Sequence, residues 1–226
     1  MAGADRAEVV GLLAESELFA GFGTGELESL ADASELRVLR RNDTVFVEAD
    51  AADELFLVRS GRIVIAMNSP DGRESVMALM EAGDLFGEMG LFTDGLSRVA
   101  SARALEASEL VAVPYAPLVG LFDARPALLW GVVRLLTRRL AATDAALADS
   151  VFLDVTGRTA KRLLELAGDA DEFVLPVTQE ELAGMVGASR ERVNKALAAF
   201  MRLGWLEQTD RRYRITDREQ LSRRAR

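Results

Sequence analysis

The chain has 226 residues, enough for two domains and a substantial hydrophobic core. It contains neither cysteine nor histidine, which excludes disulfides, iron–sulfur clusters, zinc fingers and catalytic Cys–His or Ser–His pairs. The net charge of -9 is uneven, because residues 156–226 carry 14 Lys and Arg against 11 Asp and Glu while residues 1–155 carry 13 against 25. A basic C-terminal part beside an acidic N-terminal part favours a nucleic-acid-binding module joined to a separate domain.

The N-terminal region predicts two short helices within residues 5–31, joined by the loop GFGTG at residues 21–25. The glycine cluster is compatible with a phosphate-binding loop, but no strand precedes it and no lysine follows it, so an ordinary turn is favoured. The N-terminus carries acids and lacks the apolar core of a signal peptide. The most apolar window, residues 110–122, contains two prolines and is too short to span a bilayer. We expect a soluble, cytoplasmic protein.

Residues 35–113 have strand-like patterning. Short β-rich runs occupy residues 44–47, 55–58, 63–66 and 76–79, and turn signals separate them at residues 42–43, 60–61, 70–72 and 82–84. Such short connections suit successive hairpins and are too short for the crossovers of a parallel sheet. The pattern predicts an antiparallel β barrel or sandwich.

One segment of this domain, DLFGEMGLFTDGLSRVASARA at residues 84–104, has the features of an anion site. Gly87 and Glu88 open a predicted single helical turn, where glycine allows close backbone approach and the first N–H groups are free to donate. Arg98, ten residues after Glu88, offers a planar guanidinium that can grip a phosphate at two points. A purely structural Glu88–Arg98 ion pair is the alternative.

A long helix is predicted over residues 124–150. Its candidate coiled-coil seam, with steps of 4, 3, 4, 3 and 4, comprises Leu129, Val133, Leu136, Leu140, Thr143 and Leu147. Thr143 breaks the apolar run; the residues alone favour a structural role for it, with ligand contact as the alternative. The helix is expected to end at a hinge, residues 154–158, before a short helix over residues 158–168.

Residues 178–200 predict a helix-turn-helix. Thr178 and Glu181 form a capping box, Gly187 suits a left-handed turn, and Ser189 caps the second helix. The polar residues on the outer face of that helix are Arg190, Glu191, Arg192, Asn194 and Lys195, which suit base edges and phosphates. The alternative is an ordinary helical hairpin with a solvated charged face. Residues 205–207 and 212–215 predict the β-hairpin of a wing, with arginines placed for DNA backbone contacts.

With these motifs in place, the chain resembles the CRP/FNR family of bacterial transcription regulators, specifically its cyclic-AMP-receptor-like branch of actinobacterial type. The resemblance rests on FGEMGLF…SRVASA, TRRLAATDAALADSVFLDVTGR and TQEELAGMVGASRERVNKAL, while the lack of cysteine sets aside the iron–sulfur-sensing branch. It implies an α+β fold with three parts: a β-roll effector domain of the cyclic-nucleotide-binding jelly-roll type at 1–123, a dimerisation helix and hinge at 124–153, and a winged helix-turn-helix at 154–226.

The resemblance also implies roles for individual residues. Gly87 and Glu88 would meet the ribose and phosphate of a cyclic nucleotide, with Glu88 accepting from the 2′-hydroxyl, and Arg98 would pair with the phosphate. Thr143 would bond the adenine amino group. The implied ligand-binding set is Gly87, Glu88, Met89, Arg98, Val99, Thr143 and Asp144, with Asp144 approaching from the partner subunit.

For DNA, the resemblance implies that Arg190, Glu191 and Lys195 read the major groove. The full implied DNA-binding set is Thr178, Gln179, Ser189, Arg190, Glu191, Arg192, Asn194 and Lys195, with Thr178, Gln179 and Ser189 near phosphates. The implied partners are palindromic double-stranded DNA, a second copy of the chain, RNA polymerase and a cyclic nucleotide effector, expected to be cAMP. No metal, resident cofactor or enzymatic activity is expected.

Four positions depart from the family pattern. Cyclic-AMP-binding members carry Ser or Thr where this chain has Val99, and loss of a hydrogen bond to a charged group costs about 1.5–3 kcal/mol. Asp144 adds a negative charge near an anionic ligand, Arg192 replaces Thr, and Lys195 replaces the Arg of some members.

The leading hypothesis from the resemblance is a cAMP-controlled homodimeric DNA-binding regulator. One alternative drops cAMP or substitutes another effector; another, an enzyme acting on phosphate esters through Glu88, lacks a second placed carboxylate.

Overall fold

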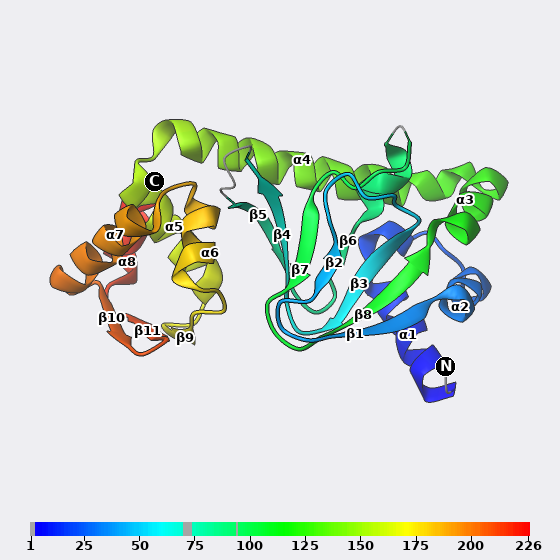
Figure 1. Cartoon of the computed structure of the whole chain (residues 1–226), viewed down its shortest axis with the longest axis horizontal. Coiled ribbons are helices and arrows are strands. Elements are labelled where there is room, and N and C mark those ends of the chain that lie inside the picture. The colour runs from blue at the N-terminus through cyan, green and yellow to red at the C-terminus, as the bar shows by residue number, and fades with distance from the viewer. Residues whose placement is uncertain (1–2, 70–73, 94) are drawn as a thin grey trace. The chain divides into compact units, whose positions relative to one another are not determined.

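The computed structural model describes residues 3–69, 74–93 and 95–226, with the side chains of residues 3–5 not described (Figure 1). The chain divides into two compact units, one of residues 1–67 and 77–141 and the other of residues 68–76 and 142–226. The turn predicted at residues 70–72 lies outside the described residues.

The first unit begins with α1 (Gly3–Glu15), the short 3-10 helix η1 (Glu17–Phe19) and α2 (Thr24–Ala33). Leu13, Phe19 and Leu30 from these elements are buried in one apolar cluster. The glycine-rich loop is a helix connection, as predicted, because the Gly23 N–H donates to the Glu26 carboxylate at 2.6 Å and so caps α2.

Two antiparallel sheets follow, which confirms the predicted class of domain. Their strands are β1 (Glu35–Leu39), β2 (Thr44–Phe46), β3 (Glu54–Ser60), β4 (Ile63–Asn68), β5 (Glu74–Met80), β6 (Leu85–Phe86), β7 (Ser101–Ala104) and β8 (Ser108–Pro114). One sheet has the order β1-β8-β3-β6 and the other β2-β7-β4-β5. Phe56, Ile63 and Phe86 lie in a buried cluster drawn from both sheets. Strands β1, β6, β7 and β8 were not predicted as separate strands.

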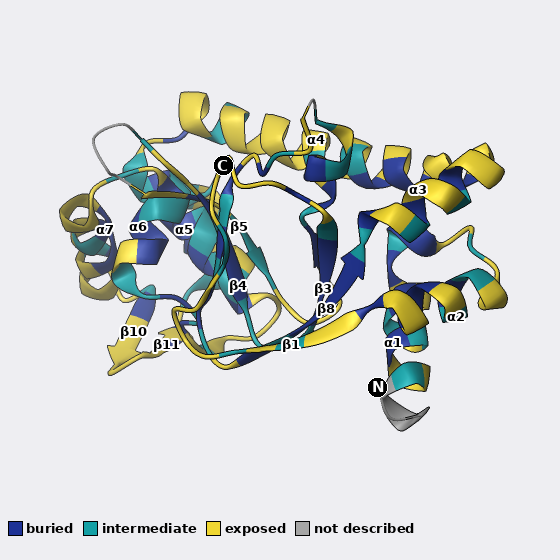
Figure 2. Cartoon of the chain, turned by 45° about the vertical axis from the view of Figure 1, so that its right-hand side comes forward, coloured by how far each residue is buried: buried dark blue, intermediate teal, exposed yellow. Residues whose placement is uncertain are grey.

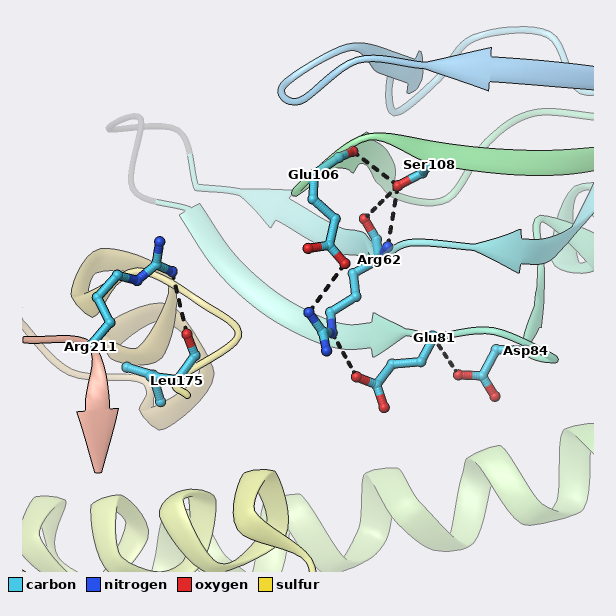
Figure 3. Close-up of polar contacts among 7 residues, drawn as sticks. All are labelled: Arg62, Glu81, Asp84, Glu106, Ser108, Leu175 and Arg211. Atoms are coloured by element: carbon cyan, nitrogen blue, oxygen red, sulfur yellow. Dashed lines mark hydrogen bonds and ion pairs between the residues drawn. The ribbon is translucent and has the colours of Figure 1, made fainter. Parts of the chain in front are cut away.

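The β3–β4 turn shows how closely this domain is packed. Gly61 has φ +83°, and a Cβ there would lie 2.2 Å from the Ser108 hydroxyl oxygen. Beside it, Arg62 donates to Glu81 at 2.8 Å and to Glu106 at 3.1 Å (Figure 3). The turn therefore requires glycine for both its backbone angle and its space.

Helix α3 (Tyr115–Ala124) and the 3-10 helix η3 (Pro126–Leu128) precede α4 (Leu129–Phe152). The long helix therefore begins five residues later than predicted, since Pro126 starts a separate 3-10 turn. Within the first unit, Gly131 of α4 packs on η1 so closely that a Cβ would lie 2.2 Å from the Leu18 carbonyl oxygen.

The second unit holds the C-terminal part of α4, then α5 (Val155–Ala167), β9 (Glu172–Val174), α6 (Gln179–Val186), α7 (Arg190–Arg202), β10 (Leu206–Thr209), β11 (Arg212–Ile215) and α8 (Arg218–Arg224). The strands form the antiparallel sheet β10-β11-β9. The hairpin was predicted, but β9 and α8 were not, and α5 begins three residues earlier than predicted, at a cap formed by Asp154. The Arg211 guanidinium ties the wing to the Leu175 carbonyl at 3.3 Å (Figure 3).

Among the described residues, no single helix is long and apolar enough to cross a bilayer. By length and composition alone, the segments 115–124 and 126–152 pass that test together, but they are bent by 116° at the break between them.

Candidate functional sites

The first candidate site is built around the turn between β6 and the 3-10 helix η2 (Glu88–Phe92). Gly87 caps η2 with φ 82°, in the left-handed region. A Cβ at this position would lie 3.0 Å from Arg98 Nη1 and 3.3 Å from the Phe56 ring. The predicted single helical turn is confirmed, and glycine is needed there for backbone angle and for closeness to Arg98.

The Arg98 side chain is almost fully buried beneath this turn. Its Nη1 donates to the carbonyls of Glu54, at 2.8 Å, and Gly87, at 3.2 Å. The guanidinium carbon lies 4.2 Å from the centre of the Phe46 ring, in cation–π contact. The Nε atom is buried and has no hydrogen-bond partner among the described residues. Protein carbonyls thus fix the guanidinium through Nη1, while its Nε–H is not used as a donor to any described residue.

Tyr115 supports the same arrangement. Its hydroxyl donates to the Gly87 carbonyl and lies 3.3 Å from Arg98 Nη1. Burial raises the pKa of Tyr115 to about 12, so the hydroxyl stays protonated and acts as a donor. Tyr115 was not predicted as part of the site, because it lies 28 positions after Gly87 and beyond the segment 84–104.

Glu88 is fully buried, and its partner is Arg139 of α4. Arg139 donates to Glu88 Oε1 and to the Leu85 carbonyl. Among the described residues no Glu88–Arg98 ion pair forms, so the structural ion pair considered as an alternative is wrong. Within the described part of the chain, Glu88 Oε2 has no hydrogen-bond partner. Burial raises the pKa of Glu88, although the charge of Arg139 opposes the shift. The site therefore contains an unpaired buried acceptor and an unpaired buried donor.

The remaining predicted ligand residues are more exposed. Met89 is 43% and Val99 38% exposed. The Arg98 N–H donates to the Asp50 carbonyl at 2.8 Å, whereas the Val99 N–H makes no hydrogen bond to any described residue. Thr143 and Asp144 lie on the part of α4 that belongs to the second unit, and both are exposed there. Their role in the pocket stays a prediction.

The second candidate site is the pair α6–α7. Thr178 Oγ1 accepts the Glu181 N–H at 3.2 Å, and the Glu181 carboxylate accepts the Thr178 N–H at 2.6 Å, which confirms the predicted capping box. Gly187 has φ 67°, and Ser189 accepts the Arg192 N–H at 3.4 Å. The local signals in the sequence therefore define both helix starts and the turn between them.

The outer face of α7 carries the predicted polar residues. Ser189, Arg190, Glu191, Arg192 and Lys195 are exposed, whereas Asn194 is half-buried. Asn194 Oδ1 is buried without a partner, which its placement on the outer face did not predict. Lys195 donates to Glu191 at 2.7 Å and lowers the pKa of that carboxyl. Two of the predicted base-reading residues are therefore paired with each other.

A pocket of about 290 Å³ lies between the start of α6 and the wing. Thr178, Gln179 and Arg211 contribute to its lining. Gln179 is hydrogen-bonded to the Tyr213 hydroxyl, whose pKa is raised by burial. On the wing itself, Arg212 and Arg214 both donate to Glu172 of β9, at 3.1 and 3.4 Å. The wing arginines are thus exposed but already neutralised in part.

An antiparallel β domain with a buried glycine–glutamate–arginine turn, followed by a winged helix-turn-helix, defines a DNA-binding transcription regulator with a cyclic nucleotide-binding domain. Residues 36–125 match the cyclic nucleotide-binding domain, and residues 157–224 match the Crp-like helix-turn-helix domain. The chain belongs to the CRP/FNR family of transcription regulators.

Three relatives illustrate the family match. The chain is 38% identical over 222 residues to the CRP-like cAMP-activated global transcriptional regulator of Mycobacterium tuberculosis, covering 95% of this chain and 99% of the relative. It is 32% identical over 160 residues to the cAMP-activated global regulator CRP of Salmonella typhimurium, covering 68% and 76%. Among solved structures, the c-di-GMP responsive global regulator CLP of Xanthomonas campestris has a TM-score of 0.75 at 29% identity, covering 85% and 99%.

Proposed function

We propose that this DNA-binding regulator is a homodimer whose affinity for operator DNA is set by a cyclic nucleotide, cAMP, bound in the β domain. The observation that carries the proposal is the buried, unpartnered Arg98 Nε beside the Gly87 turn. Buried donors are nearly always satisfied in folded proteins, so an unsatisfied guanidinium N–H at an anion-type turn indicates a missing acceptor. A cyclic phosphate supplies such an acceptor, with bidentate geometry available.

Glu88 gives the proposed ligand its second contact. Its Oε1 is occupied by Arg139, which leaves the buried Oε2 to accept from the ribose 2′-hydroxyl. Arg139 belongs to α4, so a ligand on Glu88 would be linked through one ion pair to that helix. In this proposal Met89 and Val99 border the phosphate, while Thr143 and, from the partner subunit, Asp144 contact the base.

The exposed apolar side chains of α4 support dimerisation. Figure 2 shows much of this helix as exposed. Leu140 is 62% and Leu147 63% exposed, and both belong to the predicted coiled-coil seam. A second copy of the chain, packed along this seam, would cover them. A dimer would present two α7 helices to successive major grooves about 34 Å apart, as a palindromic site requires.

The contacts proposed at DNA follow from the exposed face of α7. Arg190, Arg192 and Lys195 supply positive charge at the start of the helix, and Glu191 supplies an acceptor for cytosine. Thr178, Gln179 and Ser189 are placed near phosphates, and Asn194 is available where its half-buried side chain reaches the groove. RNA polymerase is the proposed further partner of the bound dimer.

Titration of labelled cAMP with and without a palindromic operator tests the coupling directly. Because allosteric coupling is reciprocal, operator DNA should tighten cAMP binding by the same factor by which cAMP tightens operator binding. Equal cAMP affinities in the two titrations would refute the coupling. Calorimetry with cAMP and cGMP in parallel tests the choice of nucleotide.

A second candidate function keeps DNA binding but replaces cAMP with another effector or with none. Val99 favours it, because its side chain offers no donor beside Arg98 and is partly exposed. The solved relative named as c-di-GMP responsive is a family member responsive to a different nucleotide. Footprinting on a palindrome with cAMP, with c-di-GMP and without ligand distinguishes the two candidates: protection that is the same in all three supports a ligand-independent regulator.

A further inference from the structure

The C-terminal helix α8 packs along α5 and was not anticipated from the sequence. Its Asp217 cap accepts the Gln220 N–H at 3.0 Å, and Leu221 is fully buried. The helix has only seven residues, so its position depends on what its side chains hold.

The two ends of α8 hold the two ends of α5. Near its start, Arg218 donates to the Gly168 carbonyl at 2.8 Å and to the Asp171 carboxylate at 3.0 Å, just after α5 ends. At its other end, Arg224 Nη2 donates to both carboxylate oxygens of Asp154, the N-cap of α5. Helix α8 is thus a strap fixed at both ends of α5.

Asp154 lies where α4 connects to α5 in the second unit. Helix α4 ends at Phe152 and α5 begins at Val155, so Asp154 lies in the connection between them. Its carboxylate accepts the Gly157 N–H at 2.8 Å, and this bond, reinforced by Arg224, lowers the pKa of Asp154. A Cβ on Gly157 would lie 3.0 Å from the Arg224 carbonyl oxygen, so glycine allows the end of α8 to approach.

Two other side chains cross the same connection. Arg158 of α5 donates to the Leu153 carbonyl at 2.7 Å, and Lys161 of α5 pairs with Asp149 of α4 at 2.5 Å. Both come from α5 itself. Arg224 is different, because it brings the far end of the chain onto the connection from a separate element.

We propose that Arg224 is a positioning residue for operator binding, which fixes the direction in which α5 leaves α4. Helices α6 and α7 pack on α5, so a change of angle at Asp154 moves the reading helix. This inference rests on the proposed dimer, in which two reading helices must meet two half-sites at a fixed spacing. Freedom at the connection lowers the fraction of dimers with the correct spacing, and so lowers specific affinity without removing any DNA contact.

The test compares Arg224→Ala with Arg223→Ala in the full chain. Arg223 is 64% exposed on its side chain and pairs with Glu219 of the same helix, so the control removes the same charge from the same turn. Operator and unrelated DNA are titrated at one salt concentration. Loss of a partly exposed ion pair is expected to weaken operator binding about threefold per protomer, hence about tenfold for a dimer. Unrelated DNA should respond equally to the two variants.

Asp154→Asn provides the second variant, because asparagine still caps the helix but loses the ion pair. It should reproduce the Arg224→Ala loss, and the double variant should show no further loss. Arg224→Lys should restore part of the affinity. Equal operator affinities for Arg224→Ala and Arg223→Ala, or additive losses in the double variant, would overturn the proposal. The DNA titrations contain no cyclic nucleotide. If cAMP does not change the operator affinity of the wild type, only the proposed effector is refuted. If the wild type is a monomer, the proposed dimer is refuted.

Discussion

Replacing Val99 by Ser should add a hydrogen-bond donor at the proposed phosphate site beside Gly87 and Arg98. Val99 directly follows Arg98 in the chain, and the Arg98 guanidinium is held by the Glu54 and Gly87 carbonyls. In the proposed pocket, a hydroxyl at position 99 would donate to the phosphate that Arg98 binds. A hydrogen bond to a charged group contributes about 1.5–3 kcal/mol. Because Val99 is 38% exposed and water competes there, we expect the lower end, about tenfold tighter cAMP binding.

Calorimetry of the wild type, Val99→Ser and Val99→Ala measures this effect. Alanine removes the two γ-methyl groups without adding a hydroxyl, so it separates the new hydrogen bond from relief of crowding. Only the Val99→Ser variant should bind cAMP more tightly than the wild type. If the Val99→Ser and Val99→Ala variants bind cAMP with equal affinity, the serine hydroxyl does not reach the phosphate and the proposed phosphate position is wrong.

Three further changes test other parts of the structure. Leu147→Lys places a charge on the exposed seam of α4, and sedimentation should show monomers at concentrations where the proposed wild-type dimer forms. Gly131→Ala should lower the free energy of unfolding by about 1–3 kcal/mol through the clash with Leu18, whereas Gly120→Ala, with open space around it, should be neutral or stabilising in denaturant melts. Burial raises the pKa of Glu88. The stability that the protonated Glu88 contributes is therefore full below the ordinary glutamate pKa of about 4.3 and is lost as pH rises through the raised pKa. Between these two pKa values the wild type should lose stability relative to Glu88→Gln, and parallel profiles of stability against pH would contradict the raised pKa.

The sequence was most informative where one residue determines local backbone geometry. Thr178, Gly187 and Ser189 each act within three or four positions along the chain, and the helices begin and end where those residues require. Gly87 likewise marked the turn before the 3-10 helix. Such signals depend on sequence neighbours, so they can be recognised before the fold is known.

Contacts between distant segments could not be obtained in the same way. The spacing of Glu88 and Arg98 left an ion pair between them open as an alternative, but Glu88 pairs with Arg139, 51 positions away on α4. Arg224 reaches Asp154 across 70 positions, and nothing local to either residue indicates the other. The family resemblance implied roles for Gly87 and Arg98, which stay predictions, but it did not indicate the carbonyls and rings that hold Arg98.

The aromatic floor under Arg98 has a consequence for how the protein can change. Phe46, Phe56 and Phe86 stack with one another in the core, with ring centres 5.2–6.1 Å apart, and the guanidinium lies over two of those rings. The same side chains therefore serve both the integrity of the β domain and the aim of its cationic group. In the proposed pocket, a substitution at any of these three positions should therefore change ligand affinity and the thermal stability of the β domain together.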